Sequence, residues 1–419
     1  MNINDIKMKY PGFYYYQMDN FANITLVFKF NINENKEDLV KSYILCDYLN
    51  QTNKKYQTLK DINNKCRDLY ASDYEVFTTN RGQKNYIEFK FTMLDYKIIE
   101  DNFFRDAIDF FKDIMFEPNF NGDKLDTALF EKIKQELYDS EKEKSYEPRF
   151  MEHRIFLQNL IPNSNLIKER IKDLPDLVEV LSKIKEQDIV NFYYEIINNF
   201  ARGYIFGNLS DNEIDYIAKC FNFKKTNFDN NYFVKEQISE GEKTVISKET
   251  SQSYLYVVYD ILNNKLDENY IFRVILNILN SSSGLVFKVL REELGLVYSA
   301  NADMYSMRGF MFIKAKIDKK NKDKCLEGIN EIIRRLHDKK IVGDLLKYYK
   351  ELVNDRAYTN KENYNYYLNN LNHYVFEEEM EEEKEIELIN KLTAEDIIKY
   401  VNKLEKKYIF FYQGDKDEK

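Results

Sequence analysis

The spacing of apolar residues along the chain switches between a period of two and a period near 3.6. Apolar side chains occupy every second position from Ile24 to Ile32, which predicts a strand with one buried face. Residues 38–49 then follow a helical pattern, and residues 87–93 alternate again. The first part of the chain is therefore expected to combine an antiparallel sheet with packed helices, as in an α+β domain.

The same order of patterns recurs in the second part of the chain. Residues 253–261 predict a strand, residues 267–280 a helix, and residues 309–317 another strand that follows a turn at "SMRG". Two long helical patterns come next, at residues 322–340 and 343–358. These patterns predict a second α+β domain.

An internal repeat connects the two parts. Residues 183–213 resemble residues 391–418, and each copy reads as a capped helix followed by a short strand that stops at glycine. The paired positions are Ile184 and Leu392, Asp188 and Asp396, Ile189 and Ile397, Phe192 and Tyr400, and Gly207 and Gly414. We therefore predict two homologous domains, residues 1–234 and 253–419, joined by a polar linker at residues 235–252.

Composition indicates a globular protein and limits its partners. Hydrophobic residues make up 44% of the 419 residues and Pro only five, which leaves little room for disordered linker. The net charge of -9 is spread over 62 basic and 71 acidic residues, without a long Lys/Arg run, so nucleic acid is not an expected partner. No run of about 18 apolar residues and no signal-peptide pattern appear. We therefore expect a cytoplasmic protein with no membrane partner.

The cysteines do not form a recognisable site. Cys46, Cys66, Cys220 and Cys325 lie far apart and no CxxC pair occurs. This spacing argues against both a disulfide framework and a zinc–thiolate site. Buried thiols in an apolar core are the expected role.

The histidines exclude one class of enzyme for the chain alone. His153, His337 and His373 are the only three, and none lies closer than 36 residues to another. No HExxH or HxxEH motif can exist, so a zinc hydrolase with two imidazoles on one helix turn is excluded for this chain by itself. No GxSxG elbow accompanies the histidines either.

The segment "VLREELGLVYSAN", residues 289–301, carries the most suggestive chemistry. It reads as the end of a helix, a glycine stop at Gly295 and a strand, which places Arg291 and Tyr298 near one another. A guanidinium and a phenol at such a junction suit the binding of a peptide carbonyl or carboxylate. The structural alternative is that Arg291 caps its helix C-terminus and Tyr298 is a half-buried strand residue.

A longer stretch around these residues resembles a known family. "NSSSGLVFKVLREELGLVYSAN" is similar to the C-terminal-domain signature of the M16 zinc peptidases, the pitrilysin and insulinase type. The Arg-Glu-x-x-Gly-Leu-x-Tyr pattern is matched by Arg291, Glu292, Gly295, Leu296 and Tyr298. Residues 130–150 and 187–208 also resemble parts of that family. The resemblance implies two duplicated domains, each an antiparallel-rich sheet with helices packed on one face.

The chain departs from active family members at the metal motif. Where those members carry His-x-x-Glu-His, "SYILCDYLNQT" places Ser42, Leu45 and Cys46. Glu136 fits the position of the third ligand, but one carboxylate without two imidazoles does not hold zinc tightly. This departure, together with residues 53–91, resembles the non-catalytic chain of the bacterial two-subunit M16 peptidases.

The resemblance implies a site shared with another chain. The expected partner is an HxxEH-bearing M16 homologue that forms a heterodimer and holds Zn²⁺, while Arg291 and Tyr298 grip a peptide substrate. Ser282, Ser283 and Gly284 either line the substrate site or cap the following helix. Two alternatives remain: a catalytically uninvolved scaffold or peptide-binding protein, and, more weakly, an independent hydrolase.

Overall fold

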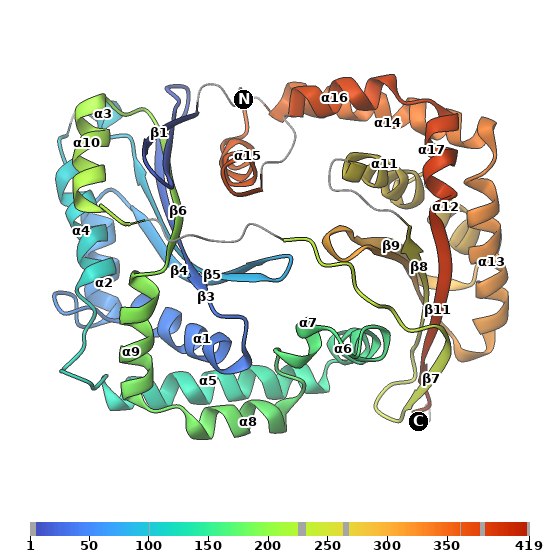
Figure 1. Cartoon of the computed structure of the whole chain (residues 1–419), viewed down its shortest axis with the longest axis horizontal. Helices are drawn as coiled ribbons and strands as arrows, with labels where there is room; N and C mark the ends of the chain where they lie inside the picture. Colours follow the sequence, from blue (N-terminus) through green and yellow to red (C-terminus); the bar gives the residue numbers. More distant parts are fainter. Residues whose placement is uncertain are drawn as a thin grey trace. The chain divides into compact units, whose positions relative to one another are not determined.

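Two sheets form the centres of the computed structural model (Figure 1), which describes residues 6–99, 101–224, 232–262, 268–360, 362–377 and 382–416. The chain divides into two compact units that are not continuous in sequence. Unit 1 comprises Met1–Lys142, Glu169–Tyr232 and Tyr364–Glu379, and unit 2 comprises Glu143–Lys168, Phe233–Asn363 and Met380–Lys419.

Unit 1 is built on a six-stranded sheet in the order β1-β2-β6-β3-β5-β4. All neighbouring strands are antiparallel except β2 and β6, which are parallel. The strands span β1 Ile6–Tyr10, β2 Phe13–Gln17, β3 Asn23–Ile32, β4 Asp73–Arg81, β5 Lys84–Leu94 and β6 Phe200–Gly207. The alternation predicted at residues 24–32 and 87–93 thus marks the two central antiparallel strands β3 and β5.

Helices cover one face of this sheet, where Phe28 lies, and α15 packs on the opposite face against Val27 and Phe206. The core between them is rich in aromatic side chains, and Phe28 of β3 stacks on Phe111 of α4 with ring centroids 6.2 Å apart. The helices assigned to unit 1 are α1 Lys36–Gln51, α2 Leu59–Asp68, α3 Tyr96–Ile99, α4 Phe104–Phe116, α5 Thr127–Tyr146, α8 Leu174–Lys183, α9 Glu186–Ile197, α10 Asp211–Cys220 and α15 Tyr364–Glu377.

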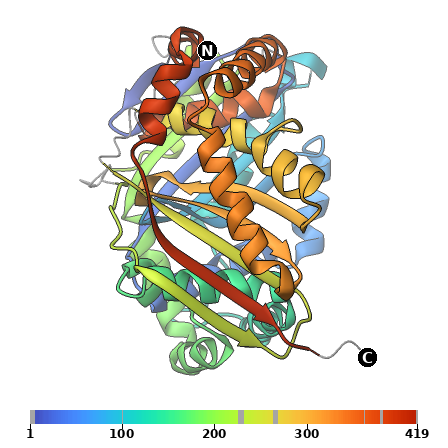
Figure 2. The same cartoon turned by 90° about the vertical axis from the view of Figure 1, so that its right-hand side faces the viewer.

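Unit 2 repeats the same sheet topology with five strands in the order β7-β11-β8-β10-β9. Its parallel pair is β7 with β11, and Figure 2 shows these two strands side by side. The strands span β7 Gly241–Ser247, β8 Ser253–Ile261, β9 Val297–Tyr305, β10 Phe310–Ile317 and β11 Leu404–Gly414. This order corresponds strand for strand to β2-β6-β3-β5-β4, so the predicted fold class of two homologous α+β domains is confirmed.

The helices predicted at residues 267–280, 322–340 and 343–358 correspond to α11, α13 and α14 of unit 2. In the predicted repeat, the copy in unit 1 is α9 with β6 and the copy in unit 2 is α17 with β11. The helical elements are α6 Pro148–Leu160, α7 Asn165–Lys168, α11 Asn269–Asn280, α12 Leu285–Phe287, the π-helix η3 Lys288–Glu293, the short 3₁₀ turns η4 Ser306–Arg308 and η5 Lys319–Asn321, α13 Lys322–Arg335, α14 Lys339–Asn360, α16 Glu382–Lys391 and α17 Ala394–Val401.

One helical stretch in the described part of the chain, Asn269–Glu293, is long and apolar enough to cross a membrane by length and composition alone. Half of its most apolar window is buried inside the protein. Val274, Ile278 and Leu290 belong to the core of unit 2. Its apolar character is therefore accounted for by packing in this unit.

The first half of the chain contributes α6 and the short α7 to unit 2, and the second half contributes α15 to unit 1. Phe156 of α6 lies on Tyr256 of β8 with ring centroids 3.9 Å apart, although α6 comes from the first half of the sequence. In unit 1, the hydroxyl groups of Tyr364 in α15 and Thr25 in β3 are hydrogen-bonded. The two compact units thus exchange segments relative to the boundaries expected from the repeat.

Candidate functional site

The candidate site begins where the helical segment of unit 2 widens into the π-helix η3. The Leu294 amide donates to the Val289 carbonyl at 3.2 Å, and the Leu296 amide donates to the Leu290 carbonyl at 2.9 Å. Gly295 then turns the chain with φ +61°, a backbone conformation that costs other residues free energy. Short π-helical turns occur often at functional sites, because they re-aim the side chains that they carry.

Arg291 and Tyr298 meet across this turn. Nη1 of Arg291 donates to the backbone carbonyl of Tyr298 at 3.4 Å, and the guanidinium lies 5.6 Å from the centre of the Phe287 ring. The Tyr298 side chain is 54% exposed, and its hydroxyl donates to Oδ1 of Asp318 at 2.9 Å. The structure therefore brings the two predicted residues together on the surface of unit 2.

Strand β9, which carries Tyr298, lies at the edge of its sheet. Val297 pairs with Ile317 and Ser299 with Lys316, so Tyr298 is the extra residue of a β-bulge. A bulge bends the strand locally and re-aims the side chain of the extra residue. An edge strand also offers backbone groups that can pair with an extended peptide.

Helix α13 packs against η3 and is joined to it by an ion pair. Nη1 and Nη2 of Arg335 donate to the two carboxylate oxygens of Glu293 at 2.8 and 2.7 Å, and these hydrogen bonds lower the pKa of Glu293. The helices approach closely at Gly328, where a Cβ atom would lie 2.7 Å from the Leu290 side chain. The backbone that carries Arg291 is therefore fixed by both packing and charge.

The small-residue loop lies immediately before this segment. Ser282 and Ser283 are exposed, while Gly284 is buried and is the N-cap of α12, without a side-chain capping bond. A Cβ atom on Gly284 would lie 2.6 Å from the Leu279 carbonyl oxygen, so the loop requires glycine there. Contact of the two serines with a substrate stays a prediction.

The predicted remnants of the metal motif lie in the core of unit 1. Ser42 and Cys46 both face Thr78 of β4, with their Oγ and Sγ atoms 3.2 and 3.8 Å from its hydroxyl oxygen. Leu45 is 1% exposed. Burial raises the pKa of the Cys46 thiol to about 12, so the thiolate that binds metals is strongly disfavoured.

Glu136 is exposed on α5, with a carboxylate oxygen 3.4 Å from Lys132 Nζ. On α1 its charge acts on Asp47, whose pKa is raised first by burial and second by Glu136. Among the described residues no group of three His, Cys, Asp or Glu side chains could hold a metal ion. These donors do not fit a zinc site.

The histidines take structural positions where their side chains are described. His153 of α6 lies with Nε2 3.0 Å from the Tyr305 hydroxyl and Nδ1 3.4 Å from that of Tyr256. His337 contacts the Ile333 carbonyl at 2.8 Å. The side chain of His373 lies outside the described residues.

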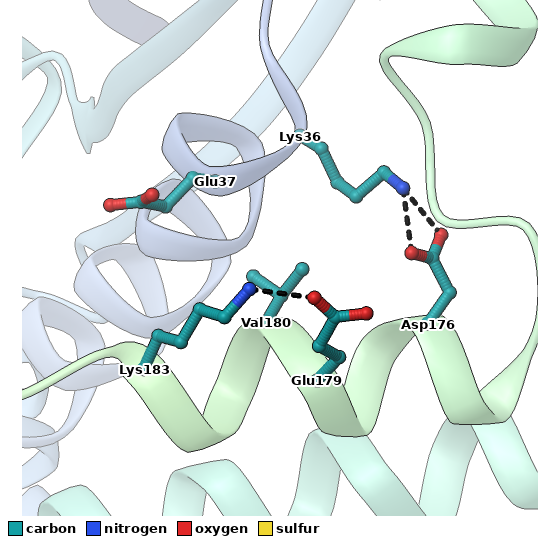
Figure 3. Close-up of a pocket in the computed structure, with 6 residues that line it drawn as sticks. All are labelled: Lys36, Glu37, Asp176, Glu179, Val180 and Lys183. Carbon is teal, nitrogen blue, oxygen red and sulfur yellow. Dashed lines mark hydrogen bonds and ion pairs between the residues drawn. The ribbon is translucent and has the colours of Figure 1, made fainter.

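A polar pocket at the start of α1 lies in unit 1 (Figure 3). Lys36 binds both carboxylate oxygens of Asp176 at 2.6 and 2.7 Å, and Lys183 binds Glu179 at 2.6 Å. Because these charges already neutralise one another, the pocket has little to offer a charged ligand. Its lining residues are Lys36, Glu37, Asp176, Glu179, Val180 and Lys183.

Sequence reasoning missed Asp318 and the Arg335–Glu293 pair. Asp318 follows β10, and the antiparallel pairing of β10 with β9 brings it to Tyr298, 20 residues earlier. The turn at "SMRG" between the two predicted strands was the signal that could have located it. Arg335 gave no such signal, because it lies on a separate helix.

Comparisons with known proteins add a family context. Residues 183–353 match the family model described as "Peptidase M16 inactive domain". The chain is 20% identical over 346 residues, 78% of each protein, to the "Probable inactive metalloprotease YmfF" of Bacillus subtilis. A solved structure of a conserved protein from Enterococcus faecalis V583 aligns with a TM-score of 0.83, 19% identity and 97% coverage of both chains. The structure titled as a peptidase M16 inactive domain from Pseudomonas fluorescens aligns at 0.73, with 13% identity, covering 99% of this chain and 98% of that one.

Proposed function

We propose that this chain, whose residues 183–353 match the M16 inactive-domain model, is the non-catalytic, substrate-binding subunit of a two-chain zinc metallopeptidase of that family. The resemblance predicted from the sequence is confirmed by these comparisons. The two-chain arrangement and the role of Arg291 and Tyr298 are the proposal.

One observation carries the proposal. Arg291 and Tyr298 are exposed together on a bulged edge strand, held by a π-helix and a glycine turn, and the described residues offer no set of metal ligands beside them. A guanidinium keeps five N–H donors in a fixed fork, and the contact with the Tyr298 carbonyl uses one. Such N–H donors suit the carbonyl groups of a peptide backbone, which favours a role in substrate binding over a reaction performed by this chain alone.

In the proposed complex, an HxxEH-bearing M16 homologue supplies zinc, the zinc-bound water and the glutamate base. This chain binds the substrate and orients it. The backbone edge of β9 pairs with an extended peptide, which gives affinity with modest sequence preference. Arg291 donates to a substrate carbonyl next to the scissile bond. We place the complex in the cytoplasm, acting on short peptides.

The test uses the chain reconstituted with an HxxEH-bearing homologue, with hydrolysis of a fluorogenic peptide as the readout. The variant Arg291→Ala with Tyr298→Phe is expected to lower kcat/KM by about 10²-fold or more, as the loss of positioned hydrogen-bonding groups typically does. The matched control is Arg334→Ala with Tyr358→Phe, an exposed pair on α13 and α14. Unchanged hydrolysis by the first variant overturns the proposed role.

A scaffold without a catalytic role is the second candidate, and one observation favours it. Both groups already have partners within unit 2, because Arg291 bonds a backbone carbonyl and Tyr298 bonds Asp318. A scaffold predicts that hydrolysis needs the chain but tolerates the Arg291 and Tyr298 substitutions. The same reconstitution therefore separates the two functions.

A further inference from the structure

The Tyr298 hydroxyl has one proton, and Asp318 accepts it. The distance from the hydroxyl oxygen to Oδ1 of Asp318 is 2.9 Å. A phenol has a single donor and lone pairs that accept, whereas a carboxylate only accepts. With its proton directed at Asp318, the phenol oxygen can act toward a substrate as an acceptor rather than as a donor.

Asp318 is half-buried at the end of β10, beside the bulge at Tyr298. Lys319, the next residue, forms an ion pair with Asp415 at 2.7 Å. The Tyr298 phenol is a hydrogen-bond partner of the Asp318 carboxylate.

We propose that Asp318 is a positioning residue that holds the Tyr298 phenol as a hydrogen-bond acceptor for the substrate, beside the donors of Arg291. This inference rests on the proposed function. A donor next to an acceptor matches the C=O and N–H groups of an extended peptide backbone. The substrate class that follows is a peptide with a free N–H at the position that faces Tyr298, so proline or an N-methylated residue is excluded there.

The first arm of the test compares three carboxylate variants in the reconstituted complex. Asp318→Ala is expected to raise KM and lower kcat/KM by about tenfold, the effect of one hydrogen bond to a charged group. Asp318→Asn is expected to stay near the wild type, because its amide oxygen accepts the same proton. Asp415→Ala is the matched control, since it removes a nearby carboxylate that does not contact Tyr298.

The second arm uses a peptide series with one N-methylated backbone amide at a time. With the wild type, N-methylation at one position of the peptide is expected to lower kcat/KM about tenfold. With Tyr298→Phe, the same methylation is expected to cause no further loss, as for coupled groups in a double-mutant cycle. Penalties that add fully to the Tyr298→Phe effect at every position overturn the inference. So does an Asp318→Ala variant that behaves like Asp415→Ala.

The arms also distinguish this inference from the proposed function. If Arg291→Ala abolishes hydrolysis while Asp318→Ala does not affect it, only the positioning role fails. If Arg291→Ala is also without effect, the proposed function itself fails.

Discussion

Gly295 is where the geometry of the site depends on a single backbone conformation. Its φ is +61°, and a Cβ atom built there would meet nothing within 4 Å. Gly295→Ala is therefore expected to destabilise unit 2 through backbone strain alone, by about 1 kcal/mol. Urea unfolding measures this change in free energy.

Gly343 in α14 is the control for that measurement. A Cβ atom there meets only the Ala394 side chain at an ordinary 3.9 Å, and the backbone is helical. Gly343→Ala is expected to stabilise the protein by about 0.5–1 kcal/mol, since alanine favours helix more than glycine does. A Gly295→Ala variant as stable as the wild type would contradict the assigned turn.

His153 occupies a buried polar cluster in unit 2. Its ring nitrogens face the hydroxyls of Tyr305 and Tyr256, and its neighbour Glu152 binds both Tyr256 and Lys314. Burial, and then the positive charge of Lys314, lower the pKa of His153 to about 4 from its ordinary value of 6.5. The neutral imidazole is therefore the form that the fold accommodates.

This shift predicts a pH dependence of stability with a definite sign. Because the folded pKa of His153 lies below the unfolded one, its contribution is fully present above pH 6.5 and is lost as the pH falls through about 4. Between pH 7 and pH 4 the wild type is expected to lose on the order of 3 kcal/mol more than His153→Gln. The difference between variants isolates His153, because Glu152, whose pKa burial raises, is common to both. Parallel stability curves would contradict the prediction.

At the scale of elements, α6 belongs with the second sheet although its sequence belongs to the first half. Phe156 is fully buried, stacks on Tyr256 and meets Phe312 edge-on with ring centroids 5.3 Å apart. Phe156→Ala is expected to cost about 3–5 kcal/mol, because it empties a packed aromatic site. Unfolding followed by denaturant titration measures the cost.

Phe150 on the same helix is the matched control, because its side chain is 43% exposed. Phe150→Ala is expected to change stability by less than about 0.5 kcal/mol. Equal effects of the two substitutions would show that α6 is not docked on the sheet of unit 2.

The central strands were predictable from sequence. Alternation identifies β3 at residues 24–32 and the apolar run at 253–261 identifies β8, but both strands proved to be buried on both faces, which the alternation did not predict. The exchange of α6 and α15 was not predictable, since a helix pattern shows that a face is buried but not against which sheet. The π-helix at Lys288–Glu293 was equally hidden, because hydropathy does not distinguish it from an α-helix.

The candidate site was predictable in part for the same reason. Arg291 and Tyr298 are seven residues apart around a glycine stop, so local geometry brings them together. Their relation to Asp318 depends on the register of β9 against β10, and that register includes a bulge that the sequence does not reveal. The positions aligned with the metal motif differ in their burial, because Ser42, Leu45 and Cys46 are buried in the core of unit 1 whereas Glu136 is exposed.

At the scale of the whole molecule, the duplication supplies an internal comparison for the Arg–Tyr pair. Unit 1 has Arg67, Ala71 and Tyr74 at the same spacing between its second helix and edge strand, and Ala71 has φ 56°. The Tyr74 hydroxyl donates to the Asn50 carbonyl at 3.0 Å, and burial raises its pKa. Tyr74 is thus partly buried and bonded to the backbone, as expected for a structural role, whereas Tyr298 is 54% exposed.

The central claim is that this chain contributes half of a peptidase site shared with an HxxEH-bearing homologue. The most direct measurement is the rate of peptide hydrolysis at constant total protein while the ratio of the two chains varies. Almost no hydrolysis is expected from either chain alone, with a maximum at equal amounts. Full hydrolysis by one chain alone, or none at any ratio, would contradict it.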